Sequence, residues 1–498
     1  MVLVFCLVSS GTLRMGKQAK MNDATRIRAP ELPASLEWFN TEQPLTLASQ
    51  RGKVVLLDFW SYCSINCMHV LPDLRYLEHK YPQNLTVIGI HSPKFENERV
   101  SEQVQKAINR NHIRHPVAND PQFQLWRAYG IKAWPSIIFI DPEGYVVGIL
   151  RGEGRRKQLD ELISKHIDAA EEKGILKHSP MPVKLQPEKA STLSFPGKVL
   201  ATRNNLYIAD SGRNRVLETY HDGKIKRVFG GGTGGMLDGK EDAAMFDNPQ
   251  GMVIVGDFLY VADTGNHSIR RIHLKSGEVM TLAGNGKQGR YVSDFFREPL
   301  DAELNSPWDL SYYEGNLYIA MAGQHQVWKM NLNHLAIERY AGSGREDIVD
   351  GALEHACFAQ PSGIVTLGSH VFVIDSETSA VRDIEINRGV VSTVVGKGLF
   401  DFGDRGGIGR EARLQHPMGI TVDDERNALW IADTYNSKIK RIDVQTSEVS
   451  AFKFSYQLNE PGGLSLFRDK MFIANTNDHQ IIALDLKSRI AEVVDVRE

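Results

Sequence analysis

The sequence predicts a protein of two domains, an α/β domain followed by an all-β propeller with six blades. The chain has 498 residues, which is more than one ordinary hydrophobic core accommodates. Up to about residue 173, short apolar runs alternate with stretches of helical spacing. Beyond residue 190 the helical pattern is absent and one motif recurs six times. These observations divide the chain into a flexible tail over 1–28, an α/β domain over 29–173, a linker over 174–190 and a propeller over 191–498.

In the α/β domain, strands and helices alternate along the chain. Apolar runs predict strands, and apolar residues at helical spacing predict helices. The expected strands are 54–60, 85–90, 137–140 and 145–150, and the expected helices are 66–80, 101–111 and 159–172. This alternation is typical of a mainly parallel sheet that helices cover on both faces. The prolines of the following segment, at 180, 182 and 187, predict a semi-extended linker.

Each repeat of the second domain begins with a Pro-x-Gly-like segment and continues with a strand that ends in an acidic turn. Successive repeats start 44 to 58 residues apart, which leaves room for about four short strands each. One blade alone cannot cover both faces of its sheet, whereas radial stacking covers them and leaves only short edges. The starting prolines are Pro196, Pro249, Pro307, Pro361, Pro417 and Pro461, and the strands end at Asp210, Asp263, Met321, Asp375, Asp433 and Asn475.

The composition excludes several functional classes. The formal net charge is −3, which gives no general attraction to nucleic acid or anionic membranes. No apolar run approaches the roughly 18 residues that a membrane span needs. Four cysteines are too few for a disulfide-stapled secreted scaffold. We therefore expect a cytoplasmic protein without a membrane span.

The first eleven residues superficially resemble a signal sequence. Their apolar core is short and no basic residue precedes it. If residues 1–11 act as a signal, the protein is secreted or periplasmic. An over-extended start, with Met15 or Met21 as the true first residue, explains the segment equally well.

A candidate redox site lies between the first predicted strand and the first predicted helix. The sequence there is Asp58-Phe-Trp-Ser-Tyr-Cys63-Ser64-Ile-Asn-Cys67. A cysteine at a helix N-terminus feels the positive end of the helix dipole, which favours the nucleophilic thiolate. A second cysteine one turn later can resolve a mixed disulfide. The segment therefore predicts thiol chemistry.

Together with Trp134-Pro135-Ser136, which precedes a later strand, this segment resembles the thioredoxin family, in particular its TlpA-like branch. The resemblance covers most of residues 30–170. It implies a cis peptide bond before Pro135, in a loop that faces the redox loop and pairs with an extended thiol substrate. It also implies that Asp58 is a buried proton acceptor beneath Cys67, with a pKa raised by burial.

The sequence departs from this family at one position. The attacking cysteine of the family lies three residues before the second cysteine, and this position is Ser64. Cys63 can replace it only from the loop before the helix, because Cβ bonds within a helix tilt in one direction. Three interpretations remain open: Cys63 is the nucleophile, Cys67 acts alone as a monothiol, or the domain has lost exchange chemistry and serves as a binding or structural module.

The two-domain arrangement resembles the NHL repeat-containing protein 2 family over roughly residues 30–498. The segments that carry this resemblance are Cys63-Ser-Ile-Asn-Cys67-Met-His-Val-Leu-Pro-Asp73 and Phe358-Ala-Gln-Pro-Ser-Gly363. Members of the family typically have Cys-Cys-Ile-Asn-Cys, with adjacent cysteines. The resemblance implies a role in redox homeostasis or as an interaction platform.

The propeller is expected to bind a protein partner, because loops from all blades converge on one face. The third blade departs from the repeat consensus and is our candidate for that surface, although its aromatic residues also suit ordinary packing between blades. The departing residues are Trp308, Tyr312, His325 and Trp328. A metal centre of His267, His325, His416 and His479 is disfavoured, because their sequence contexts differ. A further alternative is an RNA-binding stripe formed by Arg270-Arg271 and Lys438-Ile-Lys-Arg441. The net negative charge of the chain argues against it.

The sequence favours a redox-linked scaffold. Its propeller recruits a protein partner, and its first domain binds a thiol-containing protein or a small thiol. The main alternative is a thiol-disulfide oxidoreductase that uses Cys63 and Cys67, and the lower alternative is an RNA-binding propeller. We expect neither a metal nor a cofactor.

Overall fold

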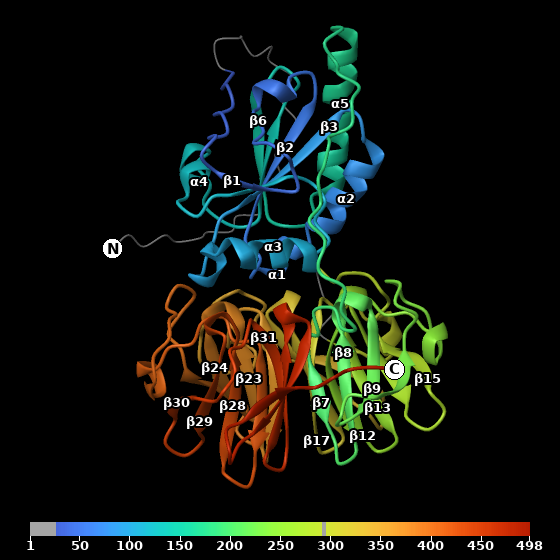
Figure 1. The fold of residues 1–498 in the computed structure, drawn as a ribbon, viewed down its shortest axis with the longest axis vertical. Coiled ribbons are helices and arrows are strands. Elements are labelled where there is room, and N and C mark those ends of the chain that lie inside the picture. The colour runs from blue at the N-terminus through green and yellow to red at the C-terminus, as the bar shows by residue number, and fades with distance from the viewer. Residues whose placement is uncertain (1–25, 291–294) are drawn as a thin grey trace.

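The computed structural model describes residues 26–290 and 295–498, in which an α/β domain is stacked on one face of a six-bladed propeller (Figure 1). The predicted fold class is confirmed. The signal-like segment and most of the expected tail lie outside the described residues. Residues 26–28, which we assigned to the tail, lie against the α/β domain, where Arg28 bridges to Tyr145. Among the described residues, no helix is long and apolar enough to cross a membrane.

The α/β domain has one six-stranded sheet in the order β1-β4-β3-β2-β5-β6. Its strands are β1 (Glu37–Phe39), β2 (Val54–Trp60), β3 (Leu85–His91), β4 (Val117–Asn119), β5 (Ser136–Ile140) and β6 (Val146–Arg151), and its α-helices are α1 (Ile65–Met68), α2 (Leu71–Lys80), α3 (Ser101–Arg110), α4 (Gln124–Ala128) and α5 (Arg156–Glu172).

The sheet is mixed, so the prediction of a mainly parallel sheet is wrong. β2, β3 and β4 are parallel neighbours, whereas β1, β5 and β6 each pair antiparallel with the adjacent strand. The short turn over 141–144 joins β5 to β6, and a tight turn can only connect antiparallel strands. The turn is visible in the sequence as Asp141-Pro-Glu-Gly144, and it indicates that the two flanking strands are antiparallel.

The predicted helix over 66–80 is also interrupted. α1 ends at Met68 and α2 begins at Leu71, with Pro72 in its first turn. A proline has no N–H and its ring clashes with the carbonyl group four residues earlier, here that of Met68. The short α1 is therefore set apart as a separate turn after the redox loop.

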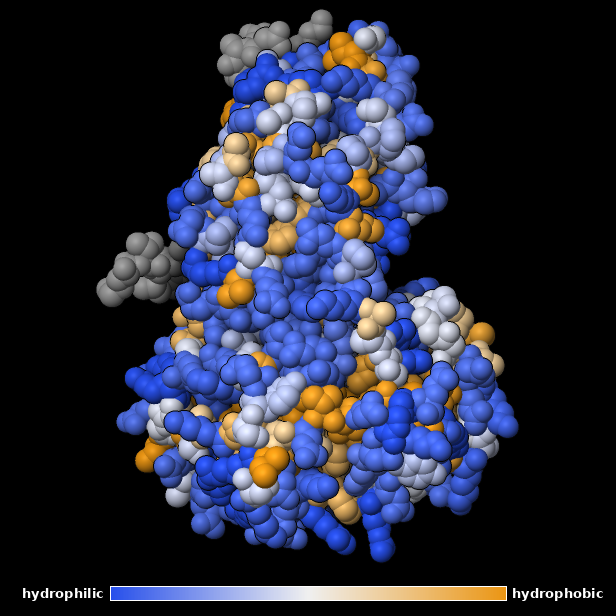
Figure 2. Space-filling model, viewed as in Figure 1, coloured by the Kyte–Doolittle hydropathy of each residue, from blue (hydrophilic) through white to orange (hydrophobic). Residues whose placement is uncertain are grey.

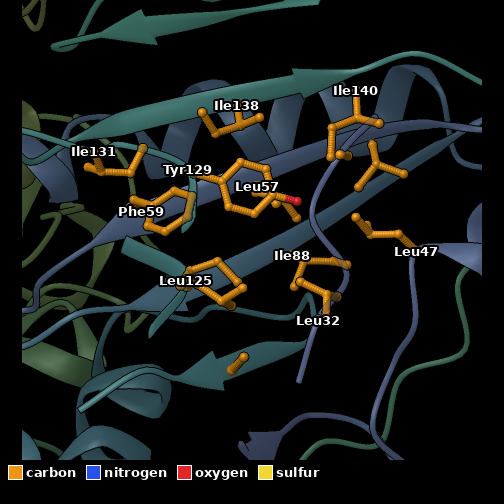
Figure 3. Packing of buried hydrophobic residues seen from close by; sticks show 14 of the residues in the cluster. Leu32, Leu47, Leu57, Phe59, Ile88, Leu125, Tyr129, Ile131, Ile138 and Ile140 are labelled. Atoms are coloured by element: carbon orange, nitrogen blue, oxygen red, sulfur yellow. The ribbon is translucent and has the colours of Figure 1, made fainter. Parts of the chain in front are cut away.

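One hydrophobic core of the domain lies between the central strands and the N-terminal segment. Leu57 and Phe59 of β2 and Ile138 of β5 pack there with Leu32 and Leu125 (Figure 3). A second core on the other face packs α2 and α5 against β2, β3 and β5. The two cores fix β2, whose C-terminal end leads into the redox loop.

The linker is held against the α/β domain by backbone hydrogen bonds. The N–H of Lys177 donates to the carbonyl of Gly52 at 2.8 Å, and the N–H of Lys184 donates to the carbonyl of Asn40 at 3.0 Å. It therefore runs along this domain as a strap before the chain enters the propeller. The outer face seen in Figure 2 is predominantly hydrophilic, including the junction of the two domains.

Each blade is an antiparallel sheet of four main strands. A two-residue strand adds to the outer edge of blades two to five. The main strands are β7 (Val199–Ala201), β8 (Asn205–Asp210), β9 (Arg215–Tyr220) and β10 (Ile225–Phe229); β12 (Pro249–Val255), β13 (Phe258–Asp263), β14 (Ser268–His273) and β15 (Glu278–Ala283); β17 (Pro307–Tyr313), β18 (Asn316–Met321), β19 (Gln326–Asn331) and β20 (Ile337–Ala341); β22 (Pro361–Leu367), β23 (His370–Asp375), β24 (Ala380–Glu385) and β25 (Val390–Val395); β27 (Gly419–Asp423), β28 (Ala428–Asp433), β29 (Lys438–Asp443) and β30 (Glu448–Phe452); and β31 (Pro461–Phe467), β32 (Lys470–Asn475), β33 (Gln480–Asp485) and β34 (Ala491–Val493). The added strands are β11 (Gly239–Lys240), β16 (Phe295–Phe296), β21 (Gly351–Ala352) and β26 (Gly407–Ile408).

The C-terminal segment closes the ring of blades. The N–H of Ile225 at the start of β10 donates to the carbonyl of Arg497 at 2.7 Å, and the N–H of Arg497 donates to the carbonyl of Gly223 at 3.1 Å. The last residues of the chain thus add to the outer edge of the first blade, which links the sixth blade to the first.

Candidate thiol site between the domains

The redox loop follows the end of β2 and precedes α1. Cys63 lies in the turn before the helix, and Ser64 is the N-cap residue with an extended backbone (φ −84°, ψ 118°). Cys67 lies within α1. Cys63 therefore occupies the only kind of position from which it could pair with Cys67. Both are free thiols that belong to one cluster of buried side chains.

Cys63 is surrounded by buried polar groups. Its Sγ lies 3.0 Å from Oγ of Ser61, and its backbone N–H donates to Oε1 of Glu98 at 3.0 Å. The fully buried Glu98 also accepts a hydrogen bond from Ser61 Oγ at 2.6 Å. Burial raises the pKa of Glu98 to about 7. Burial, with the nearby charges of Glu377 and Glu98, raises the pKa of Cys63 well above its ordinary value, so the thiol form is favoured.

Asp58 is on β2, close to Cys67 of α1, and it is also buried. Neither of its carboxylate oxygens has a hydrogen-bond partner among the described residues. Burial raises its pKa to about 7. Burial also raises the pKa of Cys67, and the charge of Asp58 adds to this increase. Near neutral pH the carboxyl group of Asp58 therefore changes its protonation, whereas Cys67 keeps its proton as a thiol.

The peptide bond between Trp134 and Pro135 is cis, as the resemblance implies. Pro135 is buried directly before β5, and the partly buried Trp134 packs against the cluster that contains Cys63 and Cys67. The structure thus brings the proline loop and the redox loop together.

The propeller covers the redox loop. Nε2 of Gln360 donates to the carbonyl of Cys63 at 2.9 Å, and its Oε1 accepts the N–H of Ile65 at 2.8 Å. The side chains of Cys63 and Cys67 are only 4% and 1% exposed. In this arrangement no extended protein substrate reaches either sulfur.

Further contacts between the two domains surround the two hydrogen bonds of Gln360, which we call the Gln360 clamp. Glu460 of the propeller accepts hydrogen bonds from Tyr62 at 2.9 Å and Asn97 at 2.6 Å, and pairs with Arg110 at 3.3 Å. Glu377 forms a buried ion pair with Lys94 of the α/β domain. These contacts lie where α1 and α3 face the propeller (Figure 1).

Sequence reasoning missed Glu98, Gln360, Glu377 and Glu460. A signal for two of them exists in the repeat itself. The residue before the blade proline has a positive φ and varies from blade to blade: Phe195, Asn248, Ser306, Gln360, His416 and Glu460. Four of these six residues contact the α/β domain: Ser306, Gln360, His416 and Glu460. A variable residue at a fixed place in each repeat therefore marks the docking face.

The four candidate partner-binding residues of the third blade do not form one surface. Trp328 is buried in the core and His325 lies on the face under the α/β domain, where its Nδ1 accepts the N–H of Gln360 at 3.0 Å. Trp308 is half-buried. Tyr312 is 37% exposed, near the far end of the seven-residue strand β17. Of the four, Tyr312 is the one available to a partner on the uncovered face.

Three of the four histidines and two of the basic residues named above have structural partners. His267, His325 and His479 occupy equivalent left-handed positions in which Nδ1 accepts a backbone N–H of the next blade. Among the described residues, no group of histidine, cysteine and acidic side chains is arranged to hold a metal ion. Arg270 and Lys440 are buried in ion pairs with Asp263 and Asp433. These two basic residues are therefore not available to the phosphates of an RNA.

Comparisons with known proteins agree with this architecture. A thioredoxin-like family model matches residues 52–146, and an NHL repeat model matches residues 246–272. NHL repeat-containing protein 2 of Bos taurus is 38% identical over 519 residues, which cover 94% of this chain and 71% of the relative. Protein SUPPRESSOR OF QUENCHING 1, chloroplastic, of Arabidopsis thaliana is 38% identical over 93% of this chain and 47% of the relative. Thiol-disulfide oxidoreductase ResA of Bacillus thuringiensis subsp. konkukian is 26% identical over 24% of this chain and 68% of the relative.

Proposed function

Because the chain belongs to the NHL repeat-containing protein 2 family, we propose that it is a redox-linked scaffold whose propeller keeps a thioredoxin-like thiol site closed. The uncovered part of the propeller recruits a protein partner. The thiol site then binds or senses a thiol-containing protein or a small thiol when the two domains part.

One observation carries this proposal: a single propeller side chain, Gln360, holds the backbone on both sides of Ser64. A free thioredoxin-like enzyme presents its cysteine to substrates, whereas here both thiols are covered. The charges of Glu98 and Glu377 further disfavour the thiolate of Cys63. The closed state therefore suppresses exchange both sterically and electrostatically.

A second candidate function is that of a thiol-disulfide oxidoreductase. It is supported by the loop position of Cys63, the cis bond before Pro135 and the buried Asp58. In that reaction the Cys63 thiolate attacks a substrate disulfide, and one substrate thiolate leaves. Cys67, after losing its proton to Asp58, then displaces the second substrate thiolate. The substrate disulfide is reduced to two thiols, and a Cys63–Cys67 disulfide is formed.

Counting free thiols after mild oxidation of the full chain separates these functions. A functional pair loses two thiols per chain together, and Cys63→Ala abolishes this loss. Reduction of insulin that disappears in Cys63→Ala would establish the oxidoreductase. If no thiol is lost even after the domains have been opened by Gln360→Ala, exchange chemistry is excluded and a binding module remains.

The proposed partner surface is the face of the propeller opposite the α/β domain. Tyr312 lies at that end of β17, because a seven-residue strand spans roughly 20 Å from the docking face. Capture of a partner by the full chain tests this surface, with Tyr312→Ala expected to weaken capture. Retained capture by the Cys63→Ala/Cys67→Ala double variant would show that recruitment does not depend on the thiols.

We propose the cytoplasm as the compartment, supported by the three described cysteines being free thiols. The Arabidopsis relative carries the word chloroplastic in its name, so an organelle is the competing outcome. Imaging of the tagged full-length chain distinguishes the two.

A further inference from the structure

A group of unpartnered polar atoms lies next to the thiol site, inside the α/β domain. Both carboxylate oxygens of Asp58, Nε1 of Trp60 and Nε2 of His115 are buried without a hydrogen-bond partner among the described residues. Burying one such atom without a partner costs about 1–3 kcal/mol. A cluster of four is therefore expensive for the fold and points to a functional role.

These atoms share one location because the strand register brings them to Gly89. Asp58 pairs with Gly89 in the parallel register of β2 and β3, so both residues face the same side of the sheet. A Cβ atom on Gly89 would lie 3.0 Å from Nε1 of Trp60 and 3.4 Å from Nε2 of His115. Asp58 and His115 are therefore neighbours on either side of Gly89, where the absence of a side chain lets the His115 ring approach the backbone.

His115 leads from Asp58 to the surface. Its Nδ1 lies 3.3 Å from Oε1 of Glu78, which is on α2 and partly exposed. Glu78 and His115 both line a pocket of about 420 Å³ together with Arg75, Arg114 and Met181. None of the residues that line this pocket belongs to the propeller. The pocket therefore reaches solvent while the thiol face is covered.

We propose that Asp58, His115 and Glu78 form a proton relay between the Cys67 thiol and this pocket. The relay lets the covered site exchange protons with solvent while the domains stay together. This inference rests on the proposed function, since it gives the buried thiol a route for its proton. His115 and Glu78 act through Asp58 and are positioning residues.

The proton balance is simple. The S–H bond of Cys67 breaks and an O–H bond forms on Asp58, which leaves a thiolate and a neutral carboxyl group. The carboxyl group passes the proton to Nε2 of His115, its neighbour at Gly89. Nδ1 of His115 releases its own proton to Glu78, which loses it to solvent in the pocket. The titratable groups that face Asp58 are thus Cys67 from α1, His115 from the segment before β4 and Glu78 from α2.

The test measures the carboxyl group of Asp58 in the full, reduced chain. Its pKa is read by NMR from isotope-labelled aspartate, and its rate of proton exchange from the infrared carboxyl band after a pH jump. Asp58→Asn assigns both signals. His115→Gln removes a charge that lowers the pKa of Asp58, and Glu78→Gln removes one that raises it. We expect shifts of roughly one pH unit in opposite directions and proton exchange that is about tenfold slower in both variants.

His79→Gln is the matched control, because His79 is exposed on the same helix and lines the same pocket. It is expected to leave the pKa and the rate unchanged. The relay is wrong if the two variants shift the pKa in one direction or not at all, or if proton exchange keeps its rate in both. Glu78→Gln is isosteric at a partly exposed position, so it decides the question even if His115→Gln fails to fold. No thiol exchange is needed for this readout, so failure of the proposed function and failure of the relay are separate results.

Discussion

Gln360 of the propeller donates a hydrogen bond from Nε2 to the carbonyl oxygen of Cys63, at 2.9 Å. The same side chain accepts the N–H of Ile65. Two residues 297 positions apart in the sequence thus define one site. The thiol chemistry of the first domain is thereby tied to the position of the second.

The stability of the protein should depend on pH through Asp58. Its pKa is about 7 in the folded chain, above the ordinary value of 3.8. The neutral carboxyl therefore contributes stability that is present below about pH 4 and is lost as the pH rises through 7. Asp58→Asn should match the wild type near pH 4 and be more stable at pH 8, by roughly 4 kcal/mol at most. Urea unfolding at both pH values checks this, and a variant less stable than the wild type at pH 8 contradicts it.

The domain interface should depend on Glu460. Glu460→Gln keeps the shape of the side chain but removes the negative charge that pairs with Arg110. Removing one partner of a buried pair costs roughly 3–5 kcal/mol. Because the Arg110 side chain is 27% exposed, we expect a smaller loss of about 2 kcal/mol, seen as a lower urea midpoint.

The control for that measurement is Asp257→Asn, which breaks an exposed ion pair with Lys275. Exposed pairs contribute about 0–1 kcal/mol, so its urea midpoint should not move. Equal losses in both variants would show that Glu460 is an ordinary surface charge.

Ser64→Cys should increase thiol reactivity. Position 64 is the N-cap of α1 and is less buried than Cys63. A thiol there lies three residues before Cys67, the spacing of the thioredoxin family. We expect mild oxidation to give a disulfide between positions 64 and 67, detected by peptide mass spectrometry. Ser64→Ala is the control, and oxidation only between position 64 and an external thiol would count against the expected geometry.

Much of the fold could be predicted from local patterns. The strand over 54–60 has the same bounds in the structure, and the six strands with acidic or equivalent ends are all present. Apolar periodicity determines such elements because each must bury one face or both. The break after Met68 was missed although Pro72 was visible, because the helical spacing of apolar residues continued across it.

The candidate site was only half predictable. The Cys63–Cys67 segment, Asp58 and the cis bond before Pro135 are local features of one domain. Gln360 and Glu460 depend on how the two domains dock, and the sequence marks them only as variable residues before the blade prolines, without showing what they contact. His115 acquires its place through the register of β3 and β4, which brings the segment before Val117 to Gly89, and the register of β2 and β3 brings Gly89 next to Asp58.

The central claim is that the propeller closes the thiol site, and the alkylation rate of Cys63 in the native full chain tests it most directly. Gln360→Ala removes the clamp, whereas Asn248→Ala changes the equivalent position of the second blade, which also has a positive φ. Among the described residues, no hydrogen bond joins Asn248 to the α/β domain. We predict that Cys63 reacts slowly in the wild type and in Asn248→Ala, and about tenfold faster in Gln360→Ala, as the loss of roughly 1.4 kcal/mol of closure implies. Equal rates in all three proteins, or fast labelling of Cys63 in the wild type, would contradict the account.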